Sequence, residues 1–211
     1  MAPSLLFLAS LLSALVSAQV PGKTPEVHPQ LDSYKCTVHG GCHKQNTAVV
    51  LDALSHNIHS IQNPNVPCGP SNKTLCPDQA TCAQNCVIEG ISDYSKYGVT
   101  TNGDSLNLKM LSPTGASLSP RVYLLQQGEH KYEMLQLTGN ELAFDVDLSK
   151  LPCGMNGALY LAEMDSQGGQ SKLNPAGAQY GTGYCDGQCF DTSYINGVVS
   201  SIVLCFARMP C

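Results

Sequence analysis

The sequence predicts an all-β fold stabilised by disulfides, and three observations support this prediction. Its 211 residues include 19 glycines and 13 prolines, which favour frequent turns over long helices. In the second half of the chain, short runs of alternating apolar and polar residues are separated by turn residues, a pattern typical of a β-sandwich or β-barrel. Eleven cysteines follow an apolar N-terminal segment, and the cysteines of exported proteins are normally oxidised.

The N-terminal segment has the pattern of a secretory signal peptide. An apolar run extends from Leu5 to Val16, and Val16-Ser17-Ala18 is a small-residue cleavage pattern before Gln19. The run is too short for a membrane anchor, which is the alternative interpretation, and no later segment approaches ~20 consecutive apolar residues. We therefore expect residues 1–18 to be a signal peptide, the protein to be secreted and extracellular, and no membrane to be a partner.

Charge and composition exclude two further classes. Eleven basic and 16 acidic residues give a net charge of −5, and no two Lys or Arg residues are adjacent, so nucleic acid is not an expected partner. The apolar content of 43% is too high for an intrinsically disordered chain. The glycine pairs Gly40-Gly41 and Gly168-Gly169 lie in no phosphate-binding motif, and we expect no cofactor.

The first half of the chain is expected to hold few regular elements. Residues 19–35 are predicted to be an extended arm, because three prolines and a glycine interrupt them. The uniformly apolar residues 48–51 predict a buried strand. Between Cys76 and Cys86 we expect a short helix, with Pro77 near its start.

The second half predicts strands joined by tight turns. Asn102-Gly103 between two alternating runs is a strong hairpin signal. In the segment 142–148, four apolar residues share one face of a predicted strand, while Asp145 and Asp147 lie on the other. Further strands are predicted at 121–126, 132–137 and 158–164.

Candidate metal ligands are few. Cys82 and Cys86, and also Cys185 and Cys189, have i, i+4 spacing, and the sequence His56-x2-His59 is a possible cation site. Exported cysteines oxidise, however, and no second cysteine pair completes a zinc pattern, so we expect no metal. A Gly-x-Ser-x-Gly nucleophile motif does not occur either.

Carboxylates are the remaining catalytic groups. Glycosidases need two of them, and in some sandwich enzymes one strand supplies both through a Glu-x-Asp-x-x-Glu pattern. The nearest run starts at Glu163-Met164-Asp165, but Gly168 stands where the second glutamate is needed. Asp145 and Asp147 are more simply explained as a solvated strand face than as a catalytic dyad.

One loop and one surface motif suggest carbohydrate. In Tyr184-Cys185-Asp186-Gly187-Gln188-Cys189, an aromatic ring and two hydrogen-bonding side chains accompany two cysteines, which suits a sugar-binding site. An ordinary crosslinked surface loop explains the same residues, and both interpretations stay open. Asn72-Lys73-Thr74 is an acceptor motif for N-glycosylation at Asn72 in an exported chain.

Several longer motifs resemble a known family, the fungal family 7 glycoside hydrolases. They lie in the family's order: Glu26-Val27-His28-Pro29-Gln30-Leu31, Val50-Leu51-Asp52-Ala53-Leu54-Ser55-His56-Asn57-Ile58-His59, Leu75-Cys76-Pro77-Asp78, Cys82-Ala83-Gln84-Asn85-Cys86, Tyr97-Gly98-Val99-Thr100-Thr101, Phe144-Asp145-Val146-Asp147, Leu151-Pro152-Cys153-Gly154-Met155-Asn156 and Tyr180-Gly181-Thr182-Gly183-Tyr184-Cys185-Asp186. The form of the second motif, without tryptophan, resembles the endoglucanase branch.

The resemblance implies a fold and an activity. Residues 19–197 would form roughly the N-terminal half of a two-sheet antiparallel β-jelly-roll sandwich. The activity implied is that of a secreted endo-β-1,4-glucanase, a monomer without a cofactor, which cleaves internal bonds of cellulose or mixed-linkage β-glucan with retention of configuration. The implied disulfides are Cys36–Cys42, Cys68–Cys86 and Cys76–Cys82. The implied glucan-binding residues are Arg121, Asn156, Tyr160, Tyr184, Asp186 and Gln188.

The sequence departs from the family pattern after Ile195-Asn196-Gly197. The family continues there to a Glu-x-Asp-x-x-Glu strand, whereas residues 198–211 are expected to be a non-family tail. No catalytic residue can therefore be assigned, and we expect the chain to be inactive as written. The alternative function is that of a non-catalytic secreted glucan-binding protein.

Overall fold

The computed structural model describes residues 20–69, 71–151 and 153–184. Its strands and helices follow in the order β1 (Val20–Pro21), β2 (Gln30–Thr37), β3 (Gly41–Leu51), η1 (Ala53–Ser55), β4 (Ile58–Ser60), α1 (Gln79–Asn85), β5 (Cys86–Ile88), η2 (Tyr94–Tyr97), β6 (Val99–Asn102), β7 (Ser105–Leu108), β8 (Val122–Leu125) and η3 (Gly177–Tyr180). The predicted all-β class is confirmed, with α1 as the single α-helix of these residues. No helix among them has the length and hydropathy that a membrane crossing requires. The expected signal peptide and tail lie outside the described residues.

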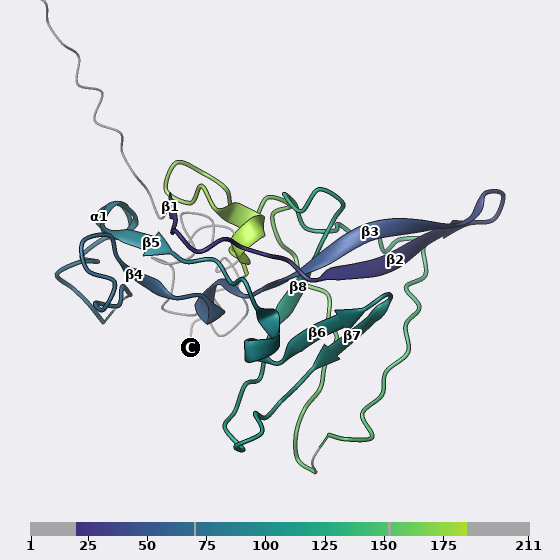
Figure 1. The fold of residues 1–211 in the computed structure, drawn as a ribbon. Coiled ribbons are helices and arrows are strands. Elements are labelled where there is room, and N and C mark those ends of the chain that lie inside the picture. Colours follow the sequence, from purple (N-terminus) through teal and green to yellow (C-terminus); the bar gives the residue numbers. More distant parts are fainter. Residues whose placement is uncertain (1–19, 70, 152, 185–211) are drawn as a thin grey trace, which may run out of the picture.

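Three small sheets organise the described residues. Their strand orders are β1-β5-β4, β2-β3-β8 and β6-β7, and every pair is antiparallel except β1 with β5. α1, β4 and β5 lie at one end, and the β2–β3 hairpin projects at the other (Figure 1). The parallel β1–β5 pair arises because the N-terminal segment runs beside residues 86–91, with Gly22 N–H donating to the Ile88 carbonyl at 2.7 Å and Val27 N–H to the Ile91 carbonyl at 3.0 Å.

The β2–β3 hairpin corrects the prediction of an extended arm over 19–35. The prolines of that segment end at Pro29, and from Gln30 onward each residue of β2 has a partner in β3. Cys36 and Cys42 face each other near the tip and form a disulfide. The arm is therefore extended only as far as Pro29, and a regular strand follows.

The inner end of β3 confirms the predicted buried strand at 48–51. Ala48 and Val50 pack in one cluster with Leu125, Tyr132 and Ala178. Val49 and Leu51 pack on the opposite face in a second cluster, with Ile91, Tyr94 and Val99. Because both faces are covered, the run is apolar at every position rather than at alternate ones.

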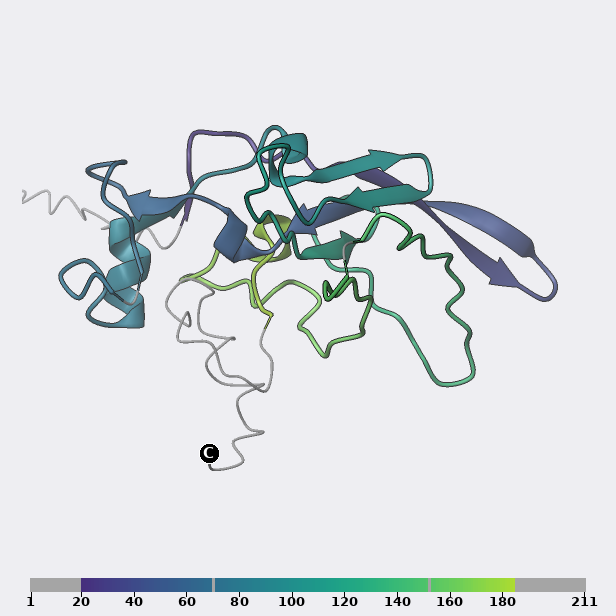
Figure 2. The ribbon, with the colours of Figure 1, turned by 90° about the horizontal axis from the view of Figure 1, so that it is seen from below.

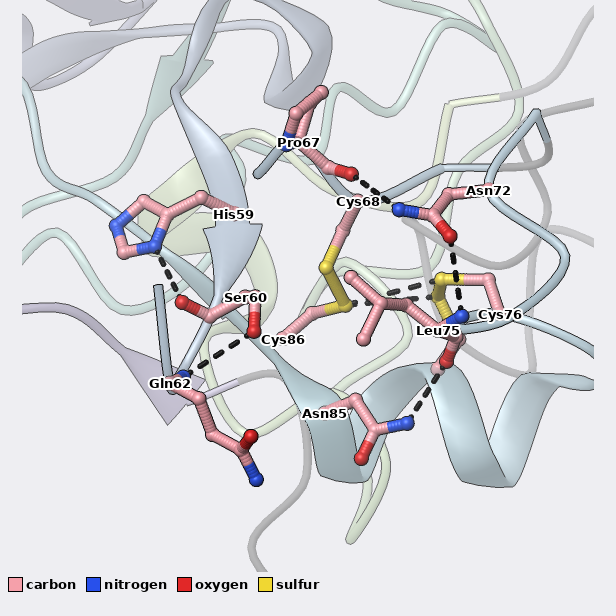
Figure 3. The surroundings of a disulfide bond; sticks show 11 residues. His59, Ser60, Gln62, Pro67, Cys68, Asn72, Leu75, Cys76, Asn85 and Cys86 are labelled. Atoms are coloured by element: carbon pink, nitrogen blue, oxygen red, sulfur yellow. Dashed lines mark hydrogen bonds between the residues drawn. A yellow bond between two sulfur atoms is a disulfide. The ribbon is translucent and has the colours of Figure 1, made fainter. Parts of the chain in front are cut away.

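Helix α1 confirms the helix predicted between Cys76 and Cys86. Asp78 caps its N-terminus by accepting a hydrogen bond from Thr81 N–H at 2.9 Å. The Cys76–Cys82 and Cys68–Cys86 disulfides lie side by side at this end of the molecule (Figure 3). Sγ of Cys86 is 3.8 Å from Sγ of Cys76 and 3.9 Å from Sγ of Cys82.

The predicted hairpin at Asn102-Gly103 forms, with its turn one residue later. Asn102 pairs with Ser105, so the turn residues are Gly103 and Asp104. Gly103 has φ +60°. The two-residue hairpin turns of types I′ and II′ both require a positive φ at their first central residue.

Three predicted strands, at 132–137, 142–148 and 158–164, are wrong. Tyr132 forms only an isolated bridge with Leu125, and the remaining residues run as a loop (Figure 2). Leu142, Phe144 and Val146 are about half exposed. The alternating pattern needs a neighbouring strand to satisfy its backbone and cover its apolar face, and none of the described strands pairs with residues 142–148 or 158–164.

Candidate functional site

Three residues that the resemblance implies for glucan binding come together in the structure. Arg121 precedes β8, Tyr160 lies in the long loop between β8 and η3, and Tyr184 follows η3. They meet beside Asp52, which directly follows β3. β8 pairs with β3 so that Leu51 faces Val122, and this register places Arg121 next to Asp52.

The carboxylate of Asp52 is the anchor of this site. It is buried, with 4% of the residue exposed. Its Oδ1 accepts a hydrogen bond from Leu54 N–H at 2.9 Å and so caps η1. Its Oδ2 accepts from Arg121 Nη2 at 3.0 Å and Nε at 3.2 Å, and also from the hydroxyl of Tyr123.

The guanidinium of Arg121 lies over the ring of Tyr184, with its carbon 4.2 Å from the ring centroid. This is a cation–π contact. The Tyr123 ring is 5.8 Å from the Tyr184 ring at an angle of 30°, and the Tyr160 hydroxyl donates to the Tyr184 hydroxyl at 3.3 Å. The four side chains form one aromatic and cationic cluster, the Arg121 cluster.

Burial and the charge of Asp52 set the protonation of this cluster. Burial raises the pKa of Tyr123 well above its ordinary value, and the neighbouring Asp52 charge raises it further. Burial opposes the charged form of Arg121, but the charge of Asp52, together with Tyr123 and hydrogen bonds to Tyr160 and Asp52, outweighs it, and the pKa of Arg121 is raised. Tyr123 is therefore a neutral donor and Arg121 a fixed cation.

The members of the Arg121 cluster differ in exposure. Tyr160 is 55% exposed, whereas Tyr184, which packs against Arg121 and the rings of Tyr123 and Tyr160, is only 7% exposed. A ligand can therefore reach Tyr160 and the partly exposed guanidinium of Arg121, while Tyr184 supports them from within.

The other predicted binding residues lie elsewhere or are not described. Asn156 is exposed in the same loop, four positions before Tyr160. Asp186 and Gln188 lie outside the described residues. Sequence reasoning missed Asp52 and Tyr123, although an aspartate directly after four apolar residues was an available signal.

The possible cation site at His56-x2-His59 is not formed. His56 Nε2 contacts Glu26 at 3.1 Å, and His59 Nε2 contacts Glu89 at 3.1 Å, so the two rings serve different carboxylates. Each ring also contacts a backbone carbonyl through Nδ1, the Asp52 carbonyl at 3.3 Å for His56 and the Ser60 carbonyl at 2.9 Å for His59. Cys82 and Cys86 offer no thiolate, because both are in disulfides.

Glu26 and Glu89 bind the N-terminal segment to the rest of the molecule. Glu26 accepts hydrogen bonds from His56 Nε2, from Ile91 N–H at 2.7 Å and from the Tyr94 hydroxyl. Glu89 accepts from Thr24 N–H at 2.7 Å as well as from His59. Burial would raise the pKa of Glu89, but these hydrogen bonds outweigh it and lower the pKa to about 2.

The acidic residues considered for catalysis have structural or solvated roles. Asp165 accepts hydrogen bonds from Gln167 N–H at 2.9 Å and Gly169 N–H at 3.0 Å and thus holds a turn. Asp145 and Asp147 are exposed, although they lie on a loop rather than on the predicted strand.

The structure also shows the cysteine pairings and the surroundings of the glycosylation motif. The three disulfides have the pairings that the resemblance implies. Cys153 is a free, exposed thiol. Asn72 is half-buried, and its Nδ2, the atom that a glycan would modify, donates to the Pro67 carbonyl at 3.1 Å (Figure 3).

Comparison with known proteins gives consistent matches. The profile of glycosyl hydrolase family 7 matches residues 20–203. Endoglucanase EG-1 of Humicola insolens is 57% identical over 200 residues, which cover 92% of this chain and 46% of the relative. Endo-beta-1,4-glucanase celB of Aspergillus oryzae is 54% identical over 192 residues, which cover 88% of this chain and 46% of the relative.

Solved structures agree with these relatives. The native Humicola insolens endocellulase EGI superposes with a TM-score of 0.79 at 55% identity, over 85% of this chain and 47% of that one. An endoglucanase I complexed with cellobiose superposes with a TM-score of 0.77 at 48% identity, over 84% of this chain and 46% of that one. This chain spans about half the length of the relatives that it matches.

Proposed function

Because the chain belongs to glycosyl hydrolase family 7, we propose that it acts in the degradation of cellulose or mixed-linkage β-glucan, as part of a secreted endo-β-1,4-glucanase that retains configuration. The Arg121 cluster carries this proposal. It joins three distant segments of the chain, and a relative with this fold has been solved with cellobiose. We further propose that the chain acts as a monomer.

The chemistry of the Arg121 cluster suits a sugar. A guanidinium donates hydrogen bonds in a fixed fork, which matches hydroxyl oxygens, and an exposed tyrosine ring offers an apolar face to a pyranose. The neighbouring Asp52 keeps Arg121 charged and directed. These groups bind without changing a covalent bond, so their role is recognition.

Hydrolysis needs groups that these residues do not supply. A retaining mechanism requires a nucleophilic carboxylate and a second carboxyl group ~5–5.5 Å away. Asp52 is held by Arg121 and Tyr123, which leaves its carboxylate unable to attack a sugar. The 211 residues contain no Glu-x-Asp-x-x-Glu run, so we propose that they bind glucan and do not hydrolyse it by themselves.

Calorimetric titration of the full chain with cellotetraose, combined with a reducing-sugar assay, tests both statements. We expect binding, loss of binding in Arg121→Gln, and no sugar release. Lys35→Gln, an exposed change on the projecting hairpin, is the control and should bind as the wild type does. Absence of wild-type binding would overturn the binding role, and sugar release would overturn the assignment of hydrolysis to other residues.

Secretion is tested separately. In a fungal expression host, the protein recovered from the culture medium should begin at Gln19, as N-terminal sequencing would show. Retention of the protein in the cells, with residues 1–18 still attached, would contradict the proposal.

A further inference from the structure

We propose that Asp52, assisted by Tyr123, is a positioning residue that fixes Arg121 in the orientation in which it recognises glucan. This inference rests on the proposed function, because it concerns how the same site is organised. Neither Asp52 nor Tyr123 needs to touch the sugar in this scheme. Both act through the guanidinium.

Asp52 is itself held rigidly. Its backbone N–H donates to the Arg121 carbonyl at 2.9 Å, which continues the β3–β8 pairing by one residue. The next N–H, of Ala53, donates to the Gly181 carbonyl at 3.0 Å. With Oδ1 directed at Leu54 N–H, the side chain presents Oδ2 to Arg121.

Two donors of one guanidinium meet that single oxygen. Nε and Nη2 of Arg121 both reach Oδ2, and the plane lies over the Tyr184 ring. A planar group held along one edge and one face has a fixed opposite edge, so the direction of Nη1 is set before any ligand arrives. An arginine on a flexible stem would otherwise lose its rotamer freedom on binding, and that loss would weaken affinity.

Tyr123 completes the arrangement. Its hydroxyl is a third donor to Oδ2, and its ring packs beside the Tyr184 ring at 5.8 Å. It therefore steadies both the carboxylate and the surface on which the guanidinium lies. Because Tyr123 stays neutral, its hydroxyl keeps the proton that it donates to the Asp52 carboxylate.

A double-mutant cycle with cellotetraose tests the proposal. Asp52→Asn keeps an oxygen for Leu54 N–H but replaces Oδ2 with a donor, and it should weaken binding roughly tenfold or more, the effect expected when a charged hydrogen bond is lost. Arg121→Gln and the double variant should bind equally, within a factor of about two. Losses that multiply in the double variant would overturn the proposal, because Asp52 would then act independently of Arg121.

The chain offers a matched control. Asp93 caps η2 through its side chain, as Asp52 caps η1, but it is exposed and lies apart from the Arg121 cluster. Asp93→Asn should leave the affinity unchanged. If Asp52→Asn does not fold, Tyr123→Phe replaces it in the cycle, with a smaller loss of affinity that should disappear in the Arg121→Gln background.

A second measurement separates this inference from the proposed function. The sequence has only two arginines, Arg121 and Arg208, so an ¹⁵N spectrum of arginine side chains is simple to assign. The Arg121 Nε–H should exchange slowly with water in the wild type and rapidly in Asp52→Asn. If the wild type binds no glucan, the proposed function fails while slow exchange still supports the positioning. Equal rates of Arg121 Nε–H exchange in the wild type and in Asp52→Asn would overturn the positioning role.

Discussion

Gly181→Ala should be far more destabilising than an ordinary glycine substitution. Gly181 follows η3 and has φ +67°, a conformation that costs an L-residue about 1–2 kcal/mol. A Cβ at this position would lie 1.9 Å from the Leu51 carbonyl oxygen and 3.0 Å from Asp52 Cα, both backbone atoms. An ordinary contact begins near 3.4 Å, so the two segments would have to separate by more than an ångström.

The magnitude follows from what that separation breaks. The hydrogen bond from Ala53 N–H to the Gly181 carbonyl contributes about 1 kcal/mol, and overpacking of a tight core contact costs about 1–3 kcal/mol. Together with the backbone strain, we expect a loss of about 3–6 kcal/mol in the free energy of unfolding.

Gly139→Ala is the matched control for this experiment. Gly139 has φ +75°, but a Cβ there would have nothing within 4 Å, so only the strain of about 1–2 kcal/mol remains. Urea unfolding followed by far-UV circular dichroism measures both variants. If Gly181→Ala loses no more stability than Gly139→Ala, the prediction that the close packing of Gly181 against the Leu51 backbone excludes a Cβ is refuted.

Glu89→Gln should flatten the dependence of stability on pH in acid. Folding lowers the pKa of Glu89 from 4.5 to about 2, so its charged form stabilises the native chain above about pH 4.5, and this contribution is lost as the pH falls towards 2. Urea midpoints between pH 5 and pH 2 should therefore fall more steeply for the wild type, whereas parallel profiles would contradict the prediction. Cys68→Ser leaves the Cys86 thiol 3.8 Å from Cys76 and 3.9 Å from Cys82. Once deprotonated, this thiol should attack the Cys76–Cys82 disulfide, joining one sulfur and releasing the other as a thiolate, so that peptide mapping of alkylated protein finds exchanged pairs. The equivalent change in the hairpin disulfide is the control, and recovery of the Cys76–Cys82 pair alone would show that no exchange occurs.

Local sequence signals predicted the elements that depend on local structure. The helix at Gln79–Asn85 has its capping aspartate and a preceding proline in sequence, and the β6–β7 hairpin has its glycine turn. The buried strand at 48–51 was visible because both of its faces are apolar. In each case, neighbouring residues carry the information.

The failures have a common physical cause. Residues 142–148 alternate like a strand, but a strand forms only when another backbone accepts its hydrogen bonds, and sequence alternation does not contain that partner. The same holds for the site. Arg121 and Tyr184 were predicted from the family resemblance, whereas Asp52 is brought next to Arg121 only by the β3–β8 register.

The anchoring of the N-terminal segment has a consequence for the order of folding. His28 contacts Glu129 at 2.7 Å and the Gln179 carbonyl at 2.8 Å, the latter across 151 positions of sequence. At a synthesis rate of about 5–20 residues per second, roughly 8–30 s pass between the appearance of His28 and that of Gln179. During that interval the buried imidazole has no partner in η3. The N-terminal segment can therefore be fixed in two stages, first to residues 56–94 through Glu26 and only later to η3 through His28.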